Sequence, residues 1–160
     1  DGTQIAARPI HPTDEPKMRD LLYNLSKETI YYRFMSQIKH FPRKQIQNFV
    51  YVDHRTSIAI VATVPEAHGE DIIAVGRYYL DETTNMAEVA FVVRDNWQNH
   101  GIGSFLMNDL VTIARRNGIS GFTAEVLPGN KAMQRVFNKS PYKVSSSPSQ
   151  DVYSFRIEFT

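Results

Sequence analysis

The segment from Gln98 to Gly103, which reads QNHGIG, is the clearest candidate for chemistry in this sequence. It follows an apolar run over residues 86–93 and precedes residues 104–116, in which apolar side chains recur at helical spacing. A glycine-bearing turn between a strand and a helix lets the backbone approach a ligand, and the first N–H groups of the helix point outward. Such a turn is suited to holding an anion, most often a phosphate or a pyrophosphate.

Two nucleotide-binding motifs fit this segment less well. In the dinucleotide pattern G-x-G-x-x-G, Gly101 and Gly103 take the first two glycine positions, but Leu106 stands at the third. Glu125 lies about twenty residues further on, where a ribose-binding acid is expected, so this interpretation keeps some support. A nucleotide P-loop is excluded because no Lys-Ser or Lys-Thr pair follows the glycines.

The composition indicates one ordinary globular domain over residues 1–160, with 42% hydrophobic and 22% charged residues. The net charge of +1 does not predict a nucleic-acid partner. No apolar run approaches the ~20 residues needed to span a bilayer, so no membrane partner is expected. The absence of cysteine excludes disulfides, a thiol nucleophile and a thiolate metal site, and it fits a cytoplasmic protein. We expect no metal site, because the five histidines show no ligand spacing: His11, His40, His54, His68 and His100.

The first fifty residues predict one strand and three short helices. The strand covers residues 5–10, and Thr13 is suited to cap the first helix. Ser26 is suited to cap a second helix over residues 27–35, and a third helical pattern follows Pro42. The aromatic side chains of the second helix are expected to pack in the core: Tyr31, Tyr32 and Phe34.

The remaining residues predict a mixed sheet. Three strand-like runs joined by short loops should form an antiparallel meander, because parallel neighbours need long crossovers. A helix over residues 102–117, with Gly118 as its C-cap, then places the next strand parallel to the third run. Asn130 is suited to cap a last helix through Lys139. The predicted strands are 57–64, 72–80, 86–93 and 122–127, with 152–159 pairing to 142–144 across a serine-rich loop.

Gln98, Gly101 and Gly103 also satisfy the motif Q/R-x-x-G-x-G/A, and with this order of elements the chain strongly resembles the GCN5-related N-acetyltransferase family. The resemblance implies an α/β (α+β) fold. Its central sheet is mixed and mostly antiparallel, with six to seven strands flanked by helices and the fourth and fifth strands splayed around coenzyme A. Acetyl-CoA would be the acyl donor, and no metal would be required.

Two longer segments, AEVAFVVR at residues 87–94 and AEVLPGNKAM at residues 124–133, resemble the acetyltransferase domains of bacterial protein lysine acetyltransferases. Those domains often sit beside acyl-CoA synthetase or acyl-CoA transferase modules. Because the chain begins at Asp1 rather than at a methionine, a single free-standing domain and a domain excised from a larger acyl-CoA-related protein both stay open. The oligomeric state, monomer or dimer, stays open as well.

The resemblance also implies which residues contact coenzyme A. Backbone groups of the strand before the motif would bind the pantetheine arm, the amides of the motif would hold the pyrophosphate, and the cap of the last helix would contact the ligand from the far side. These residues are Phe91, Val92, Val93, Gln98, Asn99, His100, Gly101, Ile102, Gly103, Ser104 and Asn130. Two cations on the last helix, Lys131 and Arg135, are candidates for the 3′-phosphate, although generic helix solvation is an equal alternative.

Glu88 matches the position at which that group carries its general base. A lysine ammonium, with a pKa of ~10.4 in water, must lose a proton before its nitrogen can attack a thioester. Partial burial by Val89 and Phe91 is expected to let the Glu88 carboxylate accept that proton, whereas a solvated, idle carboxylate is the alternative. Glu125, on the adjacent strand, is the competing carboxylate and would share the role or buttress the site.

One position departs from the family pattern. Phe137 stands where many members carry a tyrosine as general acid, and Tyr142 is a candidate substitute or a packed strand residue. A thiol with a pKa near ~8.5 can leave as the thiolate without an acid, so activity is compatible with this departure. A protein lysine side chain is the favoured acceptor, attacked directly in a ternary complex. A small-molecule amine acetyltransferase, or a non-catalytic acyl-CoA-sensing domain, is the alternative.

Overall fold

The computed structural model describes residues 4–34, 43–51, 56–67, 69–148 and 152–159. Within these ranges seven strands form one sheet in the order β1-β2-β3-β4-β5-β7-β6. The strands are β1 (Ala6–Pro9), β2 (Ser57–Glu66), β3 (Gly69–Asp81), β4 (Met86–Val93), β5 (Gly121–Val126), β6 (Lys143–Pro148) and β7 (Tyr153–Glu158). The helices are α1 (Glu15–Tyr23), α2 (Lys27–Phe34), α3 (Arg43–Val50), α4 (Ile102–Arg116) and α5 (Lys131–Asn138), with short 3₁₀ turns η1 (Pro12–Asp14) and η2 (Asp95–Trp97).

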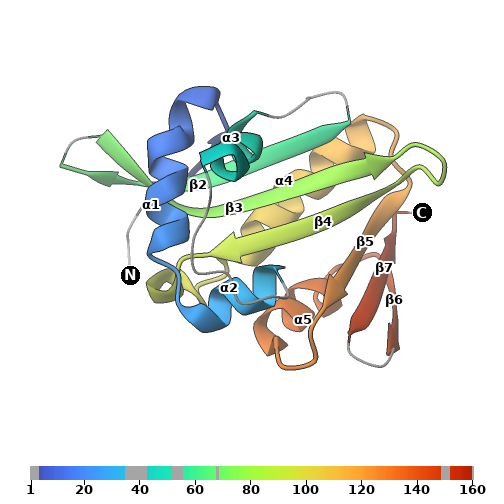
Figure 1. Ribbon diagram of the computed structural model, residues 1–160. Coiled ribbons are helices and arrows are strands. Elements are labelled where there is room, and N and C mark those ends of the chain that lie inside the picture. Colours follow the sequence, from blue (N-terminus) through green and yellow to red (C-terminus); the bar gives the residue numbers. More distant parts are fainter. Residues whose placement is uncertain (1–3, 35–42, 52–55, 68, 149–151, 160) are drawn as a thin grey trace.

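The sheet is antiparallel except for one pair of neighbours, β4 and β5, which lie parallel. In Figure 1, α1 and α3 cover one face of the sheet and α4 crosses the other. Alternation along the strands creates a separate core on each side. The core on the α4 face includes Val89, Phe91 and Leu106, and the core under α1–α3 includes Leu21, Ile46, Val61, Val75 and Val92. The mixed, mostly antiparallel sheet predicted from the sequence is therefore confirmed.

The parallel pair β4–β5 separates along its length. The two strands are paired only where Met86, Ala87 and Glu88 face Gly121, Phe122 and Thr123. Beyond those positions β4 continues to Val93 and β5 to Val126 without partnering each other, as their diverging ribbons show (Figure 1). Helices α2 and α5 lie at the wide end of this divergence. The predicted splay of the fourth and fifth strands is observed, and it leaves backbone groups of both strands outside the ladder.

The helix caps predicted at Ser26 and Gly118 are confirmed, and the cap predicted at Thr13 is wrong. The Ser26 hydroxyl accepts the Thr29 N–H at 3.1 Å, and Gly118 follows α4 with a left-handed φ of 78°. Thr13, by contrast, does not cap α1. Residues Pro12–Asp14 form a 3₁₀ turn instead, and the Asp14 carboxylate accepts the His11 N–H at 2.8 Å. Helix α1 consequently begins at Glu15, one residue later than a Thr13 cap would place it.

Two further expectations are corrected. Tyr31 is 43% exposed, so it does not pack in the core, whereas Phe34 packs partly buried against the core under α1–α3. The loop expected after Val144 is shorter than predicted, because Ser145 to Pro148 extend β6 and pair with β7. Among the described residues, no helix combines the length and the apolar character needed to cross a bilayer.

Candidate active site

The glycine segment forms a loop whose backbone amides converge at the start of α4. Asn99 has φ of 64° and Gly101 has φ of 81°, and both lie in the left-handed region. Asn tolerates this region better than most residues, and glycine enters it without steric cost. The first α4 bond runs from the Phe105 N–H to the Gly101 carbonyl, so the amides of residues 102–104 are not used by the helix ladder. The loop therefore has the geometry of an anion cradle.

The edge of β4 beside this loop presents backbone groups toward β5. The Arg94 N–H donates to the Ile73 carbonyl on β3 at 2.8 Å. Because backbone groups alternate sides along a strand, those of Phe91 and Val93 face the β5 side, where pairing has ended, and those of Val92 face β3. The Val93 carbonyl accepts the Gln98 Nε2–H at 3.0 Å, in agreement with this direction. Of the three residues predicted to contact a pantetheine arm, Phe91 and Val93 present backbone groups on the β5 side, and Val92 does not.

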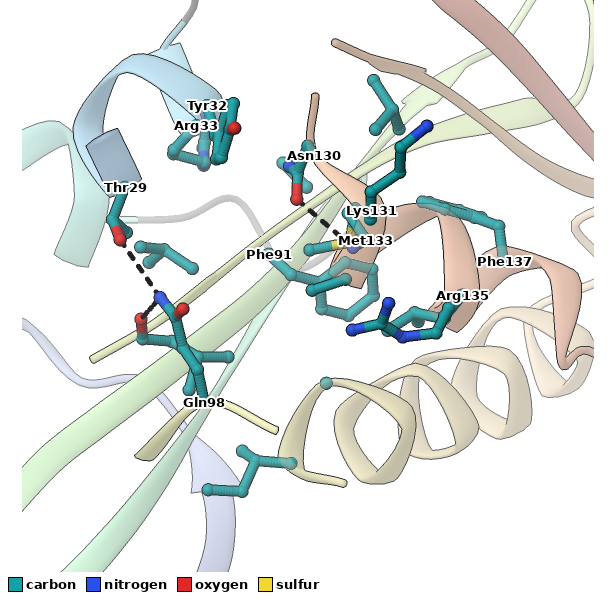
Figure 2. A pocket seen from close by; sticks show the side chains of 18 of the residues that line it. Thr29, Tyr32, Arg33, Phe91, Gln98, Asn130, Lys131, Met133, Arg135 and Phe137 are labelled. Atoms are coloured by element: carbon teal, nitrogen blue, oxygen red, sulfur yellow. Dashed lines mark hydrogen bonds between the residues drawn. The ribbon is translucent and has the colours of Figure 1, made fainter. Parts of the chain in front are cut away.

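A cavity of about 480 Å³ opens between the diverging strands. Ten of the eleven residues predicted to contact coenzyme A line it; the exception is His100, whose exposed ring lies 6.4 Å from that of Trp97. Figure 2 shows side chains from α2, the loop before α4 and α5 converging on this space. The structure therefore brings together the predicted cofactor residues, although they come from segments more than thirty positions apart.

Helix α5 forms the far wall of the cavity. Asn130 Oδ1 accepts the Met133 N–H at 3.3 Å, which confirms the predicted cap (Figure 2). The helix packs closely on α4, since a Cβ added at Gly103 would lie 3.2 Å from Val136 Cγ2. Arg135 lines the cavity and its Nη2 lies 3.4 Å from Asn99 Oδ1, so a cation stands beside the anion loop. Lys131 lines the same cavity.

A second cavity, of about 360 Å³, meets the first at Ala124 and Glu125, which line both. Glu88 lines only the second one. Glu88 is aligned with Thr123 on the parallel strand, and Glu125 stands two residues further along β5, so both carboxylates project from one face of the sheet. The strands β4 and β5 separate at a point between these two carboxylates. Apart from Phe155, the remaining residues of the second cavity are polar, and they come largely from β6 and β7: Thr123, Ser145, Ser146, Ser147, Ser154 and Arg156.

The surroundings of Glu88 differ from the expectation. Val89 and Phe91 belong to the core on the α4 face, whereas Glu88 projects from the opposite face and is exposed. The partial burial expected from those two neighbours is therefore not observed. Glu125 is exposed as well. The structure gives these carboxylates access to solvent and to an incoming ligand.

Two guanidinium groups lie on the same side of the sheet. Arg77 is 2% exposed and donates to the Phe49 carbonyl at 2.9 Å and to Tyr79 Oη at 3.1 Å. Burial, together with repulsion from Arg77, lowers the pKa of Arg33, on α2, to about 10, while Tyr79 and Glu88 oppose the change. Glu88 thus lies within electrostatic range of a cation on α2.

Neither Phe137 nor Tyr142 is able to act as a general acid here, because Phe137 lines the first cavity but carries no ionisable group and Tyr142 packs elsewhere. Phe137 is 1% exposed and its ring stacks on Phe155 with centroids 5.2 Å apart. The Tyr142 hydroxyl accepts a hydrogen bond from Arg115 at 2.6 Å, and its ring packs against Phe159 at 5.4 Å. Tyr142 lines neither cavity. Tyr142 is therefore a packed residue and not a substitute for the family's tyrosine acid.

Several lining residues were not predicted from the sequence. Glu28 and Thr29 on α2, together with Met133 and Val136 on α5, line the first cavity. Thr29 contacts Gln98, which lies 69 positions away in the chain, and nothing in local spacing signals such a contact. Of the histidines, His40, His54 and His68 lie outside the described residues. The part of the chain that the structure describes holds no group of three or more His, Asp or Glu side chains able to bind a metal ion.

Residues 21–140 match the Acetyltransferase (GNAT) family. The chain is 35% identical to the acetyltransferase Pat of Mycolicibacterium smegmatis over 86% of its own length, although it spans only 41% of that protein. It is 28% identical to the acetyltransferase PA5475 of Pseudomonas aeruginosa, covering 84% of this chain and 72% of that one. The crystal structure of the GNAT domain of S. lividans PAT superposes with a TM-score of 0.89 at 30% identity, covering 99% of this chain and 93% of that domain. The chain therefore belongs to the GNAT acetyltransferase family and is an acyltransferase.

Proposed function

We propose that this domain transfers an acetyl group from acetyl-CoA to the side-chain amine of a protein lysine. The observation that carries the proposal is the junction of the two cavities at Ala124 and Glu125, between the diverging strands. One cavity is bounded by an anion cradle and the other by two carboxylates. A phosphate-bearing donor and a cationic acceptor would thus meet at a single point from opposite sides.

The residues of the first cavity suit coenzyme A. The amides of residues 102–104 would hold the pyrophosphate, and Arg135 beside Asn99 would add positive charge. The exposed backbone edge of β4 at Phe91 and Val93 would pair with the amide groups of the pantetheine arm. Bound acetyl-CoA would supply an activated thioester, and the β4 amides would stabilise negative charge that develops on its carbonyl oxygen.

The second cavity suits an amine that arrives as an ammonium ion. Glu88 and Glu125 attract the cation, and one of them must accept its proton before the nitrogen can attack. We assign this role first to Glu88, with Glu125 as its partner at the junction. The neutral amine then attacks the thioester directly, coenzyme A leaves as the thiolate, and the extra proton on the new amide nitrogen passes to solvent or to that thiolate. Neither Phe137 nor Tyr142 is therefore needed as an acid.

Two observations favour a protein acceptor. The second cavity lies on the polar face of β5–β7–β6 and is bounded by exposed strand residues, so a side chain held on a large partner can enter it. In addition, residues 87–94 and 124–133 resemble the acetyltransferase domains of bacterial protein lysine acetyltransferases, and the chain is similar to Pat and to the S. lividans PAT domain. A small amine, such as a polyamine or an amino acid, is the competing acceptor.

The test compares the two acceptor classes with one donor. The purified domain is supplied with acetyl-CoA and either a set of lysine-containing proteins and peptides or a set of polyamines and amino acids, while free thiol release is recorded. We expect release with lysine substrates and an added acetyl mass on a lysine. Release with small amines alone would replace the proposed acceptor, and no release with either class would contradict the proposal.

A further inference from the structure

We propose that Thr29 and Asp95 are positioning residues that fasten helix α2 to the anion loop, so that a ligand in the loop also fixes α2 across the opening between β4 and β5. This inference rests on the proposed function, because it takes coenzyme A as the ligand of the loop. It concerns a different question, namely how α2, which lines the first cavity and carries Arg33 within electrostatic range of Glu88, responds when the donor binds.

Helix α2 is short, and few of its side chains are fully buried. It spans only eight residues, Lys27–Phe34, and Ile30 is its one buried residue. A helix this short is unstable in isolation, so its place depends on attachments to the rest of the molecule. Four of its residues line the first cavity: Glu28, Thr29, Tyr32 and Arg33. Any movement of α2 therefore changes the shape of the site.

The N-terminal end of α2 is attached to the loop that precedes α4. The Asp95 carboxylate accepts the Ser26 N–H at 2.9 Å, the Ser26 hydroxyl at 2.6 Å and the Thr29 hydroxyl at 2.9 Å. Partial burial alone would raise the pKa of Asp95, but these donors outweigh it and hold the pKa below its ordinary value of 3.8. Asp95 is thus an anion at neutral pH and accepts all three bonds.

Thr29 extends this attachment to the motif itself. Its hydroxyl oxygen accepts the Gln98 Nε2–H at 3.1 Å, as Figure 2 shows, and the same amide group donates to the Val93 carbonyl. The amide nitrogen of Gln98 is therefore engaged within the protein, at the edge of β4. One hydroxyl group joins α2, Asp95 and Gln98 into a single network.

The C-terminal half of α2 is attached to the opposite wall. The Tyr32 hydroxyl donates to the Gly129 carbonyl, in the turn between β5 and α5, at 3.1 Å. A Cβ at Gly129 would lie 2.9 Å from that hydroxyl oxygen, so the absence of a side chain there lets Tyr32 approach. Helix α2 consequently bridges the β4 side and the β5 side of the opening through side-chain hydrogen bonds.

From these contacts we expect ligand binding in the loop to order α2. Binding that orders residues 98–104 fixes Gln98, and Gln98 then holds Thr29 more firmly. In Thr29→Val the shape of the side chain is kept and the hydroxyl is lost, whereas in Thr29→Ser the hydroxyl is kept. The pair therefore separates the hydrogen bonds from the packing of this side chain.

Hydrogen–deuterium exchange of the whole chain, with and without coenzyme A, tests the inference. We expect coenzyme A to slow exchange in residues 98–105 and in α2 for the wild-type chain and for Thr29→Ser. In Thr29→Val the loop should still be slowed, while the slowing in α2 should fall about fivefold, the effect of losing the hydrogen bond that joins α2 to Gln98. Equal slowing of α2 in Thr29→Val, or no slowing of α2 in the wild-type chain, would overturn the inference.

A loop control, a second variant and steady-state kinetics keep the test decisive. If coenzyme A slows neither the loop nor α2, the assignment of the donor site fails and the inference fails with it, which differs from a slowed loop with an unaffected α2. Should Thr29→Val fold poorly, Asp95→Asn replaces it, because the amide removes the charged acceptor without changing the shape. In steady-state kinetics, uncoupling should raise the KM for the amine more than the KM for acetyl-CoA, whereas a purely structural defect would lower kcat with both.

Discussion

The two sides of the opening between β4 and β5 are built from different parts of the polypeptide. The side with the anion loop is made chiefly of backbone groups, shaped by the left-handed residues Asn99 and Gly101 and by the unpaired edge of β4. The side with the carboxylates is made of side chains from β4, β5, β6 and β7, and α2 closes over the opening. Backbone sites tolerate little change in conformation, whereas side-chain sites can change their ligand by substitution. This difference explains why a short sequence motif identifies the proposed donor site, whereas no motif identifies the proposed acceptor site.

The largest effect is expected from the carboxylates. Replacing Glu88 by Gln removes the proton acceptor without changing shape, and kcat/KM for the amine should fall roughly a hundredfold. The affinity for coenzyme A should stay the same, because Glu88 does not line the first cavity. Glu158, which is on the same sheet face but lines neither cavity, provides the control, and Glu158→Gln should leave kcat/KM unchanged.

Full activity in Glu88→Gln would show that the base is misassigned. Glu125→Gln then decides the alternative, since Glu125 lines both cavities. A strong loss in Glu125→Gln alone would transfer the role to that residue.

A region remote from the opening separates damage to the fold from damage to the site. Arg8 donates to both Asp14 carboxylate oxygens at 2.8 Å, and the Asp14 side chain is 5% exposed. Asp14→Asn should lower the free energy of unfolding by about 1.5–3 kcal/mol, the range for hydrogen bonds to charged groups, as measured by urea denaturation. Asp20→Asn, at an exposed position of α1, should change it by less than about 0.5 kcal/mol.

The same pair predicts a pH dependence. Burial alone would raise the pKa of Asp14, but hydrogen bonds from Arg8 and the His11 N–H lower it below its ordinary value of 3.8. A carboxyl group whose pKa is lower in the folded state stabilises that state fully above pH 3.8 and loses this contribution as the pH falls through the lower value. The stability difference between wild type and Asp14→Asn should therefore shrink in acid below pH 3.8. A difference that grows in acid would contradict the assignment.

An intermediate effect is expected at Gly101. Its left-handed φ of 81° is required by the turn, while a Cβ there would meet nothing within 4 Å, so strain and not crowding opposes substitution. Gly101→Val should cost about 1–2 kcal/mol of loop conformation and weaken coenzyme A binding roughly tenfold, measured by calorimetry. Gly101→Asn should bind more tightly than the valine variant, because Asn accepts this conformation. Equal affinities for the two variants would contradict the backbone account of the donor site.

The smallest effect is expected at Phe137. Its ring lies in an aromatic stack with Phe155, so a hydroxyl group added by Phe137→Tyr is not needed to protonate a leaving thiolate. We expect kcat to change by less than about threefold. A tenfold gain in kcat would show that chemistry is limited by the missing acid and would weaken the proposed thiolate departure.

The sequence predicted the donor side in detail because its determinants are local. The strand before the loop, the glycine positions and the Asn130 cap all follow from spacing and residue type within short windows. The Thr13 cap was wrong because the Asp14 carboxylate, held by Arg8 and the His11 N–H, fixed a different turn. That competing interaction involves β1 and could not be weighed from helix signals alone.

The attachment of α2 and the surroundings of Glu88 were predicted only in part, because they depend on contacts between distant segments. The network of Thr29, Asp95 and Gln98 links residues 66 to 69 positions apart. The exposure of Glu88 followed from the direction of its strand face, which depends on which side α4 covers. The alternation of residues along a strand shows which side chains share a face, but it does not show which face the helix packs against.

The structure of this domain with bound coenzyme A would test the central claim most directly. We predict that the pyrophosphate lies on the amides of residues 102–104 and that the thiol ends at the junction of the two cavities, beside Ala124 and Glu125. The second cavity should then remain open to the amine, with Glu88 at its wall. A thiol that points away from this junction, or a pyrophosphate bound elsewhere, would contradict the account.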